Sequence, residues 1–188
     1  MDNTWLRDFQ YTKSMQKRIK TLLSMVPLKE YGSLMDLGCG LQKARKYIPK
    51  KMHYVPVDIY NHCPTTFICD FNKGEFPDRN VDVILCSGVI EYIYDVDSFV
   101  RNITSRSEVV VGSYNFVESF HDRPSIWVNR LTISDLVSLF YKYGFCLVEM
   151  RMGEQKDRKI WNSKITPFDH DHYFVFTKQP DPTPEIKG

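Results

Sequence analysis

Two glycines and three aspartates in the first half of the chain are spaced as in a nucleotide-binding site. Asp36 lies near the end of an apolar stretch and is followed by the turn residues Gly38 and Gly40. Glycines at such a turn let the backbone approach a ligand without a Cβ atom in the way. Asp58 follows at close to the roughly 20-residue offset at which a second-strand carboxylate binds ribose hydroxyls. Asp70 closes a further apolar stretch, so the spacing indicates a ligand that contains a ribose.

The same stretch argues against a dinucleotide. A dinucleotide-binding turn has a third glycine near the position that Lys43 occupies in this chain. Such a ligand would also place a pyrophosphate beside Asp36, where like charges repel. A ligand that joins an adenosine to an ammonium and a sulfonium group meets both objections. We therefore expect Asp36 to select a cationic nucleoside.

The rest of the chain predicts strands and helices in alternation. Short apolar runs bounded by turn residues predict strands, and apolar residues three to four apart predict helices. The expected strands span residues 33–37, 53–59, 66–69, 81–86, 108–111, 146–152 and 172–178. The expected helices span 15–26, 41–48, 97–103 and 132–143, the last beginning with a capping box of Thr132 and Asp135. Pro56 indicates that the second strand is near an edge or irregular.

This order predicts an α/β fold in a single domain. Strands that alternate with helices form a parallel sheet with helices on both faces. No convincing helix separates the last two strands, so we expect a hairpin that adds an antiparallel C-terminal strand to a mostly parallel, seven-stranded sheet. Ligands bind such sheets beyond the carboxyl ends of the strands, where the strand order reverses. Those ends carry Asp36, Asp58, Asp70 and Ser87.

On these residues the chain resembles the class I S-adenosylmethionine-dependent methyltransferases, and among them the small-molecule, type 11-like enzymes. The acidic residue and Gly-x-Gly of their first motif are matched from Asp36 to Gly40, and Asp58 and Asp70 match their later acids. The resemblance covers about residues 30–150 and implies a Rossmann-like three-layer αβα sandwich. It implies S-adenosyl-L-methionine as methyl donor and S-adenosyl-L-homocysteine as product. The cofactor-binding residues that it implies are Asp36, Gly38, Cys39, Gly40, Asp58, Ile59, Asp70, Phe71 and Ser87.

We accordingly expect three segments. Residues 1–32 form an N-terminal helical segment that caps the site, and residues 33–178 form the cofactor-binding methyltransferase domain. Residues 179–188 are rich in proline and are expected to be a disordered tail.

The segment after the fourth expected strand departs from the family. Small-molecule methyltransferases often carry Leu-Glu-His here, whereas this chain has Ile90, Glu91 and Tyr92. The missing histidine favours an alternative in which the chain is a non-catalytic S-adenosylmethionine-binding module, either a sensor or an inactive partner subunit. A nicotinamide-dependent enzyme is a third hypothesis, which Asp36 and Lys43 disfavour.

Residues 113–130 are where this family commonly builds its acceptor site, and they are dense in polar and aromatic side chains. Methyl transfer to oxygen requires removal of a proton, which a positioned base can accept. Our first candidate base is His121, because the unperturbed pKa of histidine is about 6.5. Glu91 is the second candidate, and His121 could instead be a loop residue without a role. By analogy we expect a small-molecule acceptor, such as an oxygen of a metabolite or of a sugar or glycan precursor.

Composition argues against several other classes of protein. The 25 basic and 23 acidic side chains give a net charge of +2, which would not gather a nucleic acid. No apolar stretch reaches the roughly 20 residues that cross a bilayer, so we expect no membrane insertion. Five cysteines without a Cys-x-x-Cys pair suit reduced thiols in the cytoplasm. The stretch from Asp169 to His172 lacks an evident third ligand, so we expect no metal.

Overall fold

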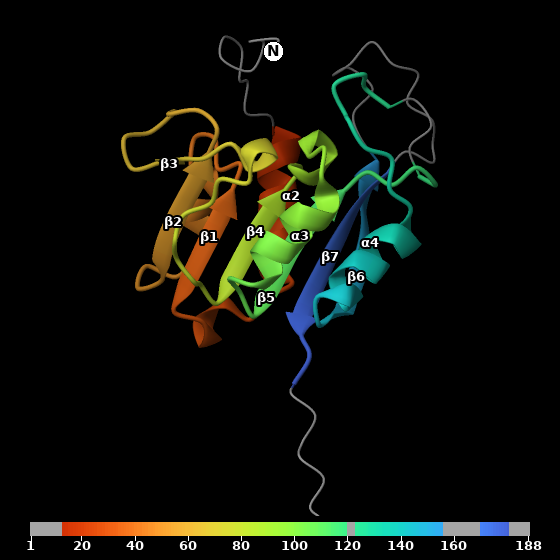
Figure 1. The fold of residues 1–188 in the computed structure, drawn as a ribbon. Coiled ribbons are helices and arrows are strands. Elements are labelled where there is room, and N and C mark those ends of the chain that lie inside the picture. Colours follow the sequence, from red (N-terminus) through yellow and green to blue (C-terminus); the bar gives the residue numbers. More distant parts are fainter. Residues whose placement is uncertain (1–12, 120–122, 156–169, 181–188) are drawn as a thin grey trace, which may run out of the picture.

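The fold is given by a computed structural model, which describes residues 13–119, 123–155 and 170–180. Its strands form one seven-stranded sheet in the order β3-β2-β1-β4-β5-β7-β6 (Figure 1). The strands are β1 (Ser33–Leu37), β2 (His53–Asp58), β3 (Phe67–Ile68), β4 (Val83–Ser87), β5 (Val109–Tyr114), β6 (Phe145–Gln155) and β7 (His170–Lys178). The first five strands are parallel, and β7 is antiparallel to both β5 and β6. The predicted sheet with its C-terminal hairpin is confirmed.

Helices cover both faces of the sheet, which confirms the three predicted layers. Helix α2 (Lys13–Ser24) lies on one face, and α3 (Val96–Thr104) and α4 (Ile133–Lys142) lie on the other (Figure 1). Because successive strand residues point to opposite faces, the sheet separates two apolar cores. Leu34 belongs to the core that includes Leu22 of α2, whereas Met35 belongs to the core that includes Phe99 of α3 and Phe140 of α4.

Local signals explain where α4 begins and ends. The hydroxyl of Thr132 accepts from the backbone N–H of Asp135, and the Asp135 carboxylate accepts from the backbone N–H of Thr132. This reciprocal pair satisfies two N–H groups that a helix start would otherwise leave without partners, and it is the predicted capping box. Gly144 follows the helix with a φ of 77°, a conformation that stops helices at little cost for glycine.

The segment after β1 differs from the prediction. The expected helix over 41–48 is instead a five-residue 3₁₀ helix, η2 (Lys43–Tyr47). Gln42 precedes it with a left-handed φ of 53°, which interrupts a right-handed helix. The Gln42 amide donates to the hydroxyls of Thr65 and Thr66 at 3.0 Å each. Contacts between the turn and a segment more than 20 residues away therefore prevent the α-helix that the spacing of apolar residues predicts.

Strand lengths also differ at the edges of the sheet. The third strand is only two residues long, and it pairs with Val57 and Asp58 alone. Pro56 therefore has no partner strand on that side, which agrees with its predicted place near an edge. The sixth strand continues to Gln155, and two irregularities in its register let it follow β7 that far. The segment boundaries at 32 and 178 stay predictions, and residues 1–12 and 181–188 lie outside the described ranges.

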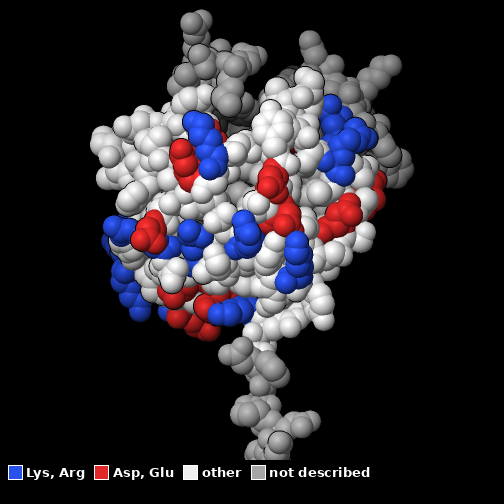
Figure 2. Space-filling model, viewed as in Figure 1, with Lys and Arg blue, Asp and Glu red and all other residues white. Residues whose placement is uncertain are grey.

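Within the described ranges, no helix has the length and apolar content needed to span a membrane. Basic and acidic side chains are interspersed over the face that carries α3 (Figure 2). Neither sign of charge dominates this face.

Candidate functional site

The strand order reverses between β1 and β4, and the Gly-x-Gly turn lies at the carboxyl end of β1. Gly38 and Gly40 have positive φ values of 69° and 48°. A Cβ atom on Gly38 would lie 2.6 Å from Cγ2 of Val89, in the loop after β4. Both the backbone conformation and the close approach of that loop therefore require glycine at position 38.

Asp36 is buried on β1, with 3% of its surface exposed. Its Oδ2 accepts a hydrogen bond of 2.5 Å from the hydroxyl of Tyr54 on β2. Burial raises the pKa of Asp36, the Tyr54 hydrogen bond lowers it and the charge of Asp58 raises it, and together they give a pKa of about 7. A carboxylate held in this way gains most from a cationic partner, because such a partner would favour its charged form.

Asp58 ends β2 and holds the glycine turn in place. Its Oδ2 accepts from the backbone N–H of Gly40 at 2.8 Å, and its Oδ1 accepts from that of Tyr60 at 3.1 Å. Each carboxylate oxygen has a second lone pair, so hydroxyl groups can still donate to it. Ile59, beside it, is 40% exposed.

Asp70 follows β3 and caps a short 3₁₀ helix, η3 (Phe71–Lys73). Its Oδ1 accepts from the backbone N–H of Asn72 at 3.1 Å, and Lys73 lies 3.5 Å from its Oδ2. The ring of Phe71 packs against that of Phe76, with centroids 5.0 Å apart. These contacts fix the loop that carries Asp70.

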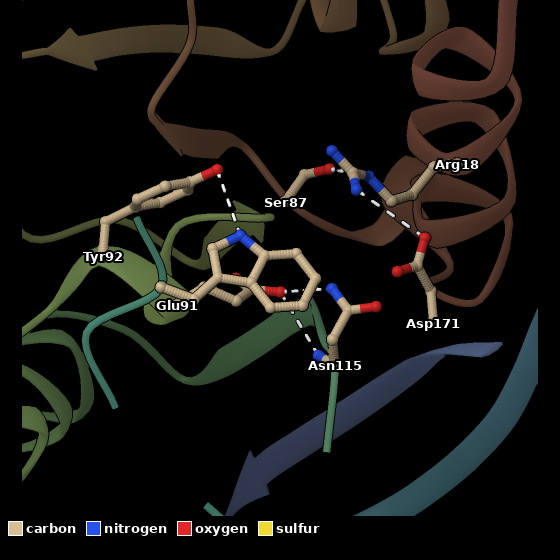
Figure 3. A network of polar contacts seen from close by, with 7 residues as sticks. Arg18, Ser87, Glu91, Tyr92, Asn115 and Asp171 are labelled. Carbon is tan, nitrogen blue, oxygen red and sulfur yellow. Dashed lines mark hydrogen bonds and ion pairs between the residues drawn. The ribbon is translucent and has the colours of Figure 1, made fainter. Parts of the chain in front are cut away.

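A polar network joins the carboxyl end of β4 to α2 and β7 (Figure 3). Arg18 of α2 donates from Nε to the hydroxyl of Ser87 at 3.0 Å, and its Nη1 lies 3.7 Å from Oδ2 of Asp171. A Cβ atom on Gly88 would lie 2.8 Å from Nη2 of Arg18, so the guanidinium lies directly against the turn after β4. No other hydrogen bond of this guanidinium to a described residue is formed.

Glu91 lies in the next turn, η4 (Ile90–Tyr92), and is 1% exposed. Its Oε1 accepts from the side-chain amide of Asn115 at 2.6 Å and from the Asn115 backbone N–H at 3.2 Å (Figure 3). Its Oε2 is buried and has no hydrogen-bond partner among the described residues. Burial raises the pKa of Glu91, and the charge of Arg18 and the Asn115 amide partly offset that effect.

Tyr92 occupies the position at which the small-molecule methyltransferases that the sequence resembles often have histidine. Its hydroxyl accepts from Nε1 of Trp127 at 3.3 Å, which ties η4 to the stretch after β5 (Figure 3). Burial and the charge of Glu91 raise the pKa of Tyr92, so its hydroxyl keeps its proton at neutral pH. Tyr92 therefore does not replace the missing imidazole as a base at neutral pH.

The stretch after β5 is held by Arg123. Its guanidinium donates to the backbone oxygens of Asn115 and Asn129 and lies 4.9 Å from the ring centre of Trp127. The Asn129 amide in turn donates to the backbone oxygens of Ile90 and Ile93. Hydrogen bonds thus join this stretch to η4. The first candidate base, His121, lies outside the described residues.

Sequence reasoning missed four residues of this region, namely Arg18, Tyr54, Asn115 and Asp171. Arg18 had a usable signal, because it lies at helical spacing between Met15 and Leu22 on the apolar side of α2. Asp171 belongs to the stretch from Asp169 to His172, at which the sequence predicts no metal site. Among the described residues no group of three potential ligands could hold a metal ion. Tyr54 and Asn115 carried no signal in the sequence.

No protein-family model matches the chain, and no curated protein matches its sequence. Solved structures do share its fold. A chain of the complex that contains the Haloferax volcanii Trm112 methyltransferase activator is 14% identical, with a TM-score of 0.70 over 90% of this chain and 92% of that one. The magnesium protoporphyrin IX methyltransferase of Synechocystis PCC 6803, with bound S-adenosylhomocysteine, is 12% identical, with a TM-score of 0.65 and 93% of each chain covered.

The small RNA methyltransferase HEN1 is 15% identical, with a TM-score of 0.66 over 93% of this chain and 26% of that one. Other matched structures are described as S-adenosylmethionine-dependent methyltransferases. Their acceptors range from a porphyrin to an RNA, so the shared fold does not identify the acceptor. The chain has the fold of the class I S-adenosylmethionine-dependent methyltransferases.

Proposed function

We propose that the protein is a methyltransferase that uses S-adenosyl-L-methionine and releases S-adenosyl-L-homocysteine. The observation that carries this proposal is the buried carboxylate of Asp36, directly before a glycine turn at the point where the strand order reverses. Such a carboxylate would repel a phosphate and attract an ammonium. Nicotinamide dinucleotides fit this site poorly for the same reason.

The residues at the carboxyl ends of the strands each bind a different part of the cofactor. Asp36 binds the ammonium group at the amino-acid end, and the turn of Gly38, Cys39 and Gly40 contacts the ligand. Asp58, with Ile59 beside it, takes the ribose hydroxyls, and Asp70 with Phe71 takes the adenine. Ser87 lies near the amino-acid end. When bound, the cofactor supplies an activated methyl group, and these side chains orient it toward the acceptor.

Arg18 extends this site from the N-terminal segment. Only Nε of its guanidinium donates a hydrogen bond to a described side chain, which leaves further N–H groups beside Ser87. A carboxylate is the group that an arginine fork binds best, and the cofactor's amino-acid end carries one. This contact supports the expectation that residues 1–32 cap the site.

We further propose a small acceptor with an oxygen nucleophile, bound near η4 and the stretch after β5. The buried Oε2 of Glu91 lacks a partner among the described residues and can accept a hydrogen bond or a proton. Its raised pKa brings proton uptake closer to neutral pH, as a general base requires. His121 remains the alternative base.

A non-catalytic cofactor-binding module is the second candidate function. Tyr92 favours it, because a tyrosine whose hydroxyl keeps its proton stands where related enzymes carry histidine. We place the protein in a reducing compartment such as the cytoplasm, because all five cysteines are free thiols.

Two measurements test these proposals. Isothermal titration calorimetry with S-adenosyl-L-methionine should detect binding, and no binding at millimolar ligand would refute both candidate functions. Release of S-adenosyl-L-homocysteine in the presence of a panel of hydroxylated acceptors should follow if the protein is an enzyme. Binding without release across a broad panel would favour the module.

A further inference from the structure

Asp36 and Tyr54 meet across the neighbouring strands β1 and β2. In the register of these strands Tyr54 lies opposite Leu34, one pleat before Asp36. Leu34 and Asp36 share a face because side chains alternate along a strand. The 2.5 Å hydrogen bond from the Tyr54 hydroxyl to Oδ2 of Asp36 is therefore set by the strand register.

This contact leaves the second oxygen of the carboxylate for another donor. No described residue donates a hydrogen bond to Oδ1 of Asp36. The other titratable or charged groups around the pair are Asp58 on β2, Cys39 in the turn, Cys86 on β4 and Arg45 on η2. Among all these groups, only Tyr54 donates a hydrogen bond to Asp36.

We propose that Tyr54 is a positioning residue that favours the ionised form of Asp36 and leaves Oδ1 available for the ammonium group of the cofactor. This inference rests on the proposed function. A hydrogen bond to a carboxylate favours its charged form, whereas burial and a neighbouring negative charge favour the neutral form. Without the Tyr54 hydroxyl, burial and the charge of Asp58 would remain, and both favour the neutral form of Asp36.

The proposal makes ligand affinity depend on pH. Burial raises the pKa of Asp36 to about 7, so affinity for an ammonium should rise as the pH rises through 7 and level off above it. Tyr54→Phe removes the hydroxyl and keeps the ring, which packs below the Arg45 guanidinium at 5.4 Å. Loss of one charge-assisted hydrogen bond should move the midpoint up by about one pH unit and weaken binding at pH 7 about fivefold.

The probe is S-adenosyl-L-homocysteine, which keeps the amino-acid ammonium and lacks the sulfonium charge. Its dissociation constant is measured by calorimetry between about pH 5.5 and pH 8. Any titration of the ligand's own ammonium in this range is the same for the wild type and the variants, so it cancels when they are compared. The control is Tyr47→Phe, which removes the hydroxyl of another half-buried tyrosine packed on the same core. Asp36→Asn provides a second test, because an amide does not titrate in this range.

We expect the midpoint to move in Tyr54→Phe, to stay in Tyr47→Phe and to vanish in Asp36→Asn. An equal midpoint in wild type and Tyr54→Phe would overturn the inference, as would a midpoint near pH 7 that persists in Asp36→Asn. If Tyr54→Phe does not fold, the comparison of the wild type with Asp36→Asn still decides whether the Asp36 carboxylate sets the midpoint that the inference requires. Absence of binding to the wild type at every pH would refute the proposed function instead.

Discussion

Arg18 of α2 donates from Nε to the hydroxyl of Ser87 at the carboxyl end of β4, across 3.0 Å. The two residues are 69 positions apart in the chain. Their contact brings a cation from the N-terminal segment to the point where the strand order reverses. Under the proposed function, a cation at this place would complement the carboxylate of the cofactor's amino-acid end, as Asp36 would complement its ammonium.

Replacement of this cation should weaken cofactor binding. Arg18→Ala removes a charge-assisted contact, so we expect the dissociation constant for S-adenosyl-L-methionine to rise about 10- to 100-fold. Arg18→Lys keeps the charge but loses the planar fork and should give a smaller increase. Calorimetry measures both, with Lys20→Ala as the control, because Lys20 is an exposed cation of the same helix.

Arg18→Ala should also lower the melting temperature, because it removes the ion pair between the guanidinium and the buried carboxylate of Asp171. The two effects are separable. A lower melting temperature with an unchanged dissociation constant would mean that Arg18 stabilises the fold and does not bind the cofactor.

The glycine turn should tolerate no side chain at position 38. Gly38→Ala places a Cβ atom 2.6 Å from Val89 in a backbone conformation with φ of 69°, so we expect loss of stability together with loss of cofactor binding. Gly144→Ala is the matched control, because Gly144 has a φ of 77° and open space around its Cβ position. The control should lose only about 1 to 2 kcal/mol of stability from backbone strain. Equal losses of stability in the two variants, with binding retained in both, would contradict a close approach at Gly38.

Much of the sheet was predictable, because most of its parallel strands are apolar runs followed by a polar or turn residue. Asp36 lies next to the end of such a run, Asp58 and Ser87 end theirs, and their order in the sequence predicts that all three lie at one edge of a parallel sheet. The capping box of Thr132 and Asp135 was predictable for a similar reason, since its two partners lie three residues apart. These signals are local, and nothing elsewhere in the fold opposes them.

The rest depends on contacts between distant segments. The spacing of apolar residues over 41–48 predicts an α-helix, but the left-handed Gln42 binds Thr65 and Thr66 and a 3₁₀ helix forms. In the sequence Arg18 is one of several cations on an amphipathic helix, and only the fold places it beside Asp171. No local pattern reveals that Tyr54 donates to Asp36, because strand register decides which side chains meet.

Asp36 should make the protein less stable at higher pH. Burial raises its pKa from 3.8 to about 7, so between these values the folded chain holds a proton that the unfolded chain has lost. Stability from this group therefore falls as the pH rises from about 4 to about 7 and is constant above that. Asp36→Asn removes this dependence, so its melting temperature should exceed that of the wild type increasingly up to pH 7.

Thermal unfolding at several pH values measures this difference. Asp82→Asn is a control of opposite sign, because hydrogen bonds from Ser33 and Gly32 outweigh burial and lower the pKa of Asp82. It should destabilise the protein above pH 4, and the loss should shrink as the pH falls below that value. A melting-temperature difference between Asp36→Asn and wild type that does not change with pH would contradict the raised pKa.

Glu91 offers the sharpest test of catalysis among the described residues. Glu91→Gln keeps an oxygen that can accept from Asn115, so the fold and the affinity for S-adenosyl-L-homocysteine should change little. An amide cannot take a proton from an acceptor hydroxyl, so turnover should fall about 100-fold or more if Glu91 is the base. His121→Gln is made in parallel, and the larger loss of turnover, with disappearance of the acidic limb of the pH profile, identifies the base. If neither variant changes turnover, both assignments are wrong and the proton leaves by another route.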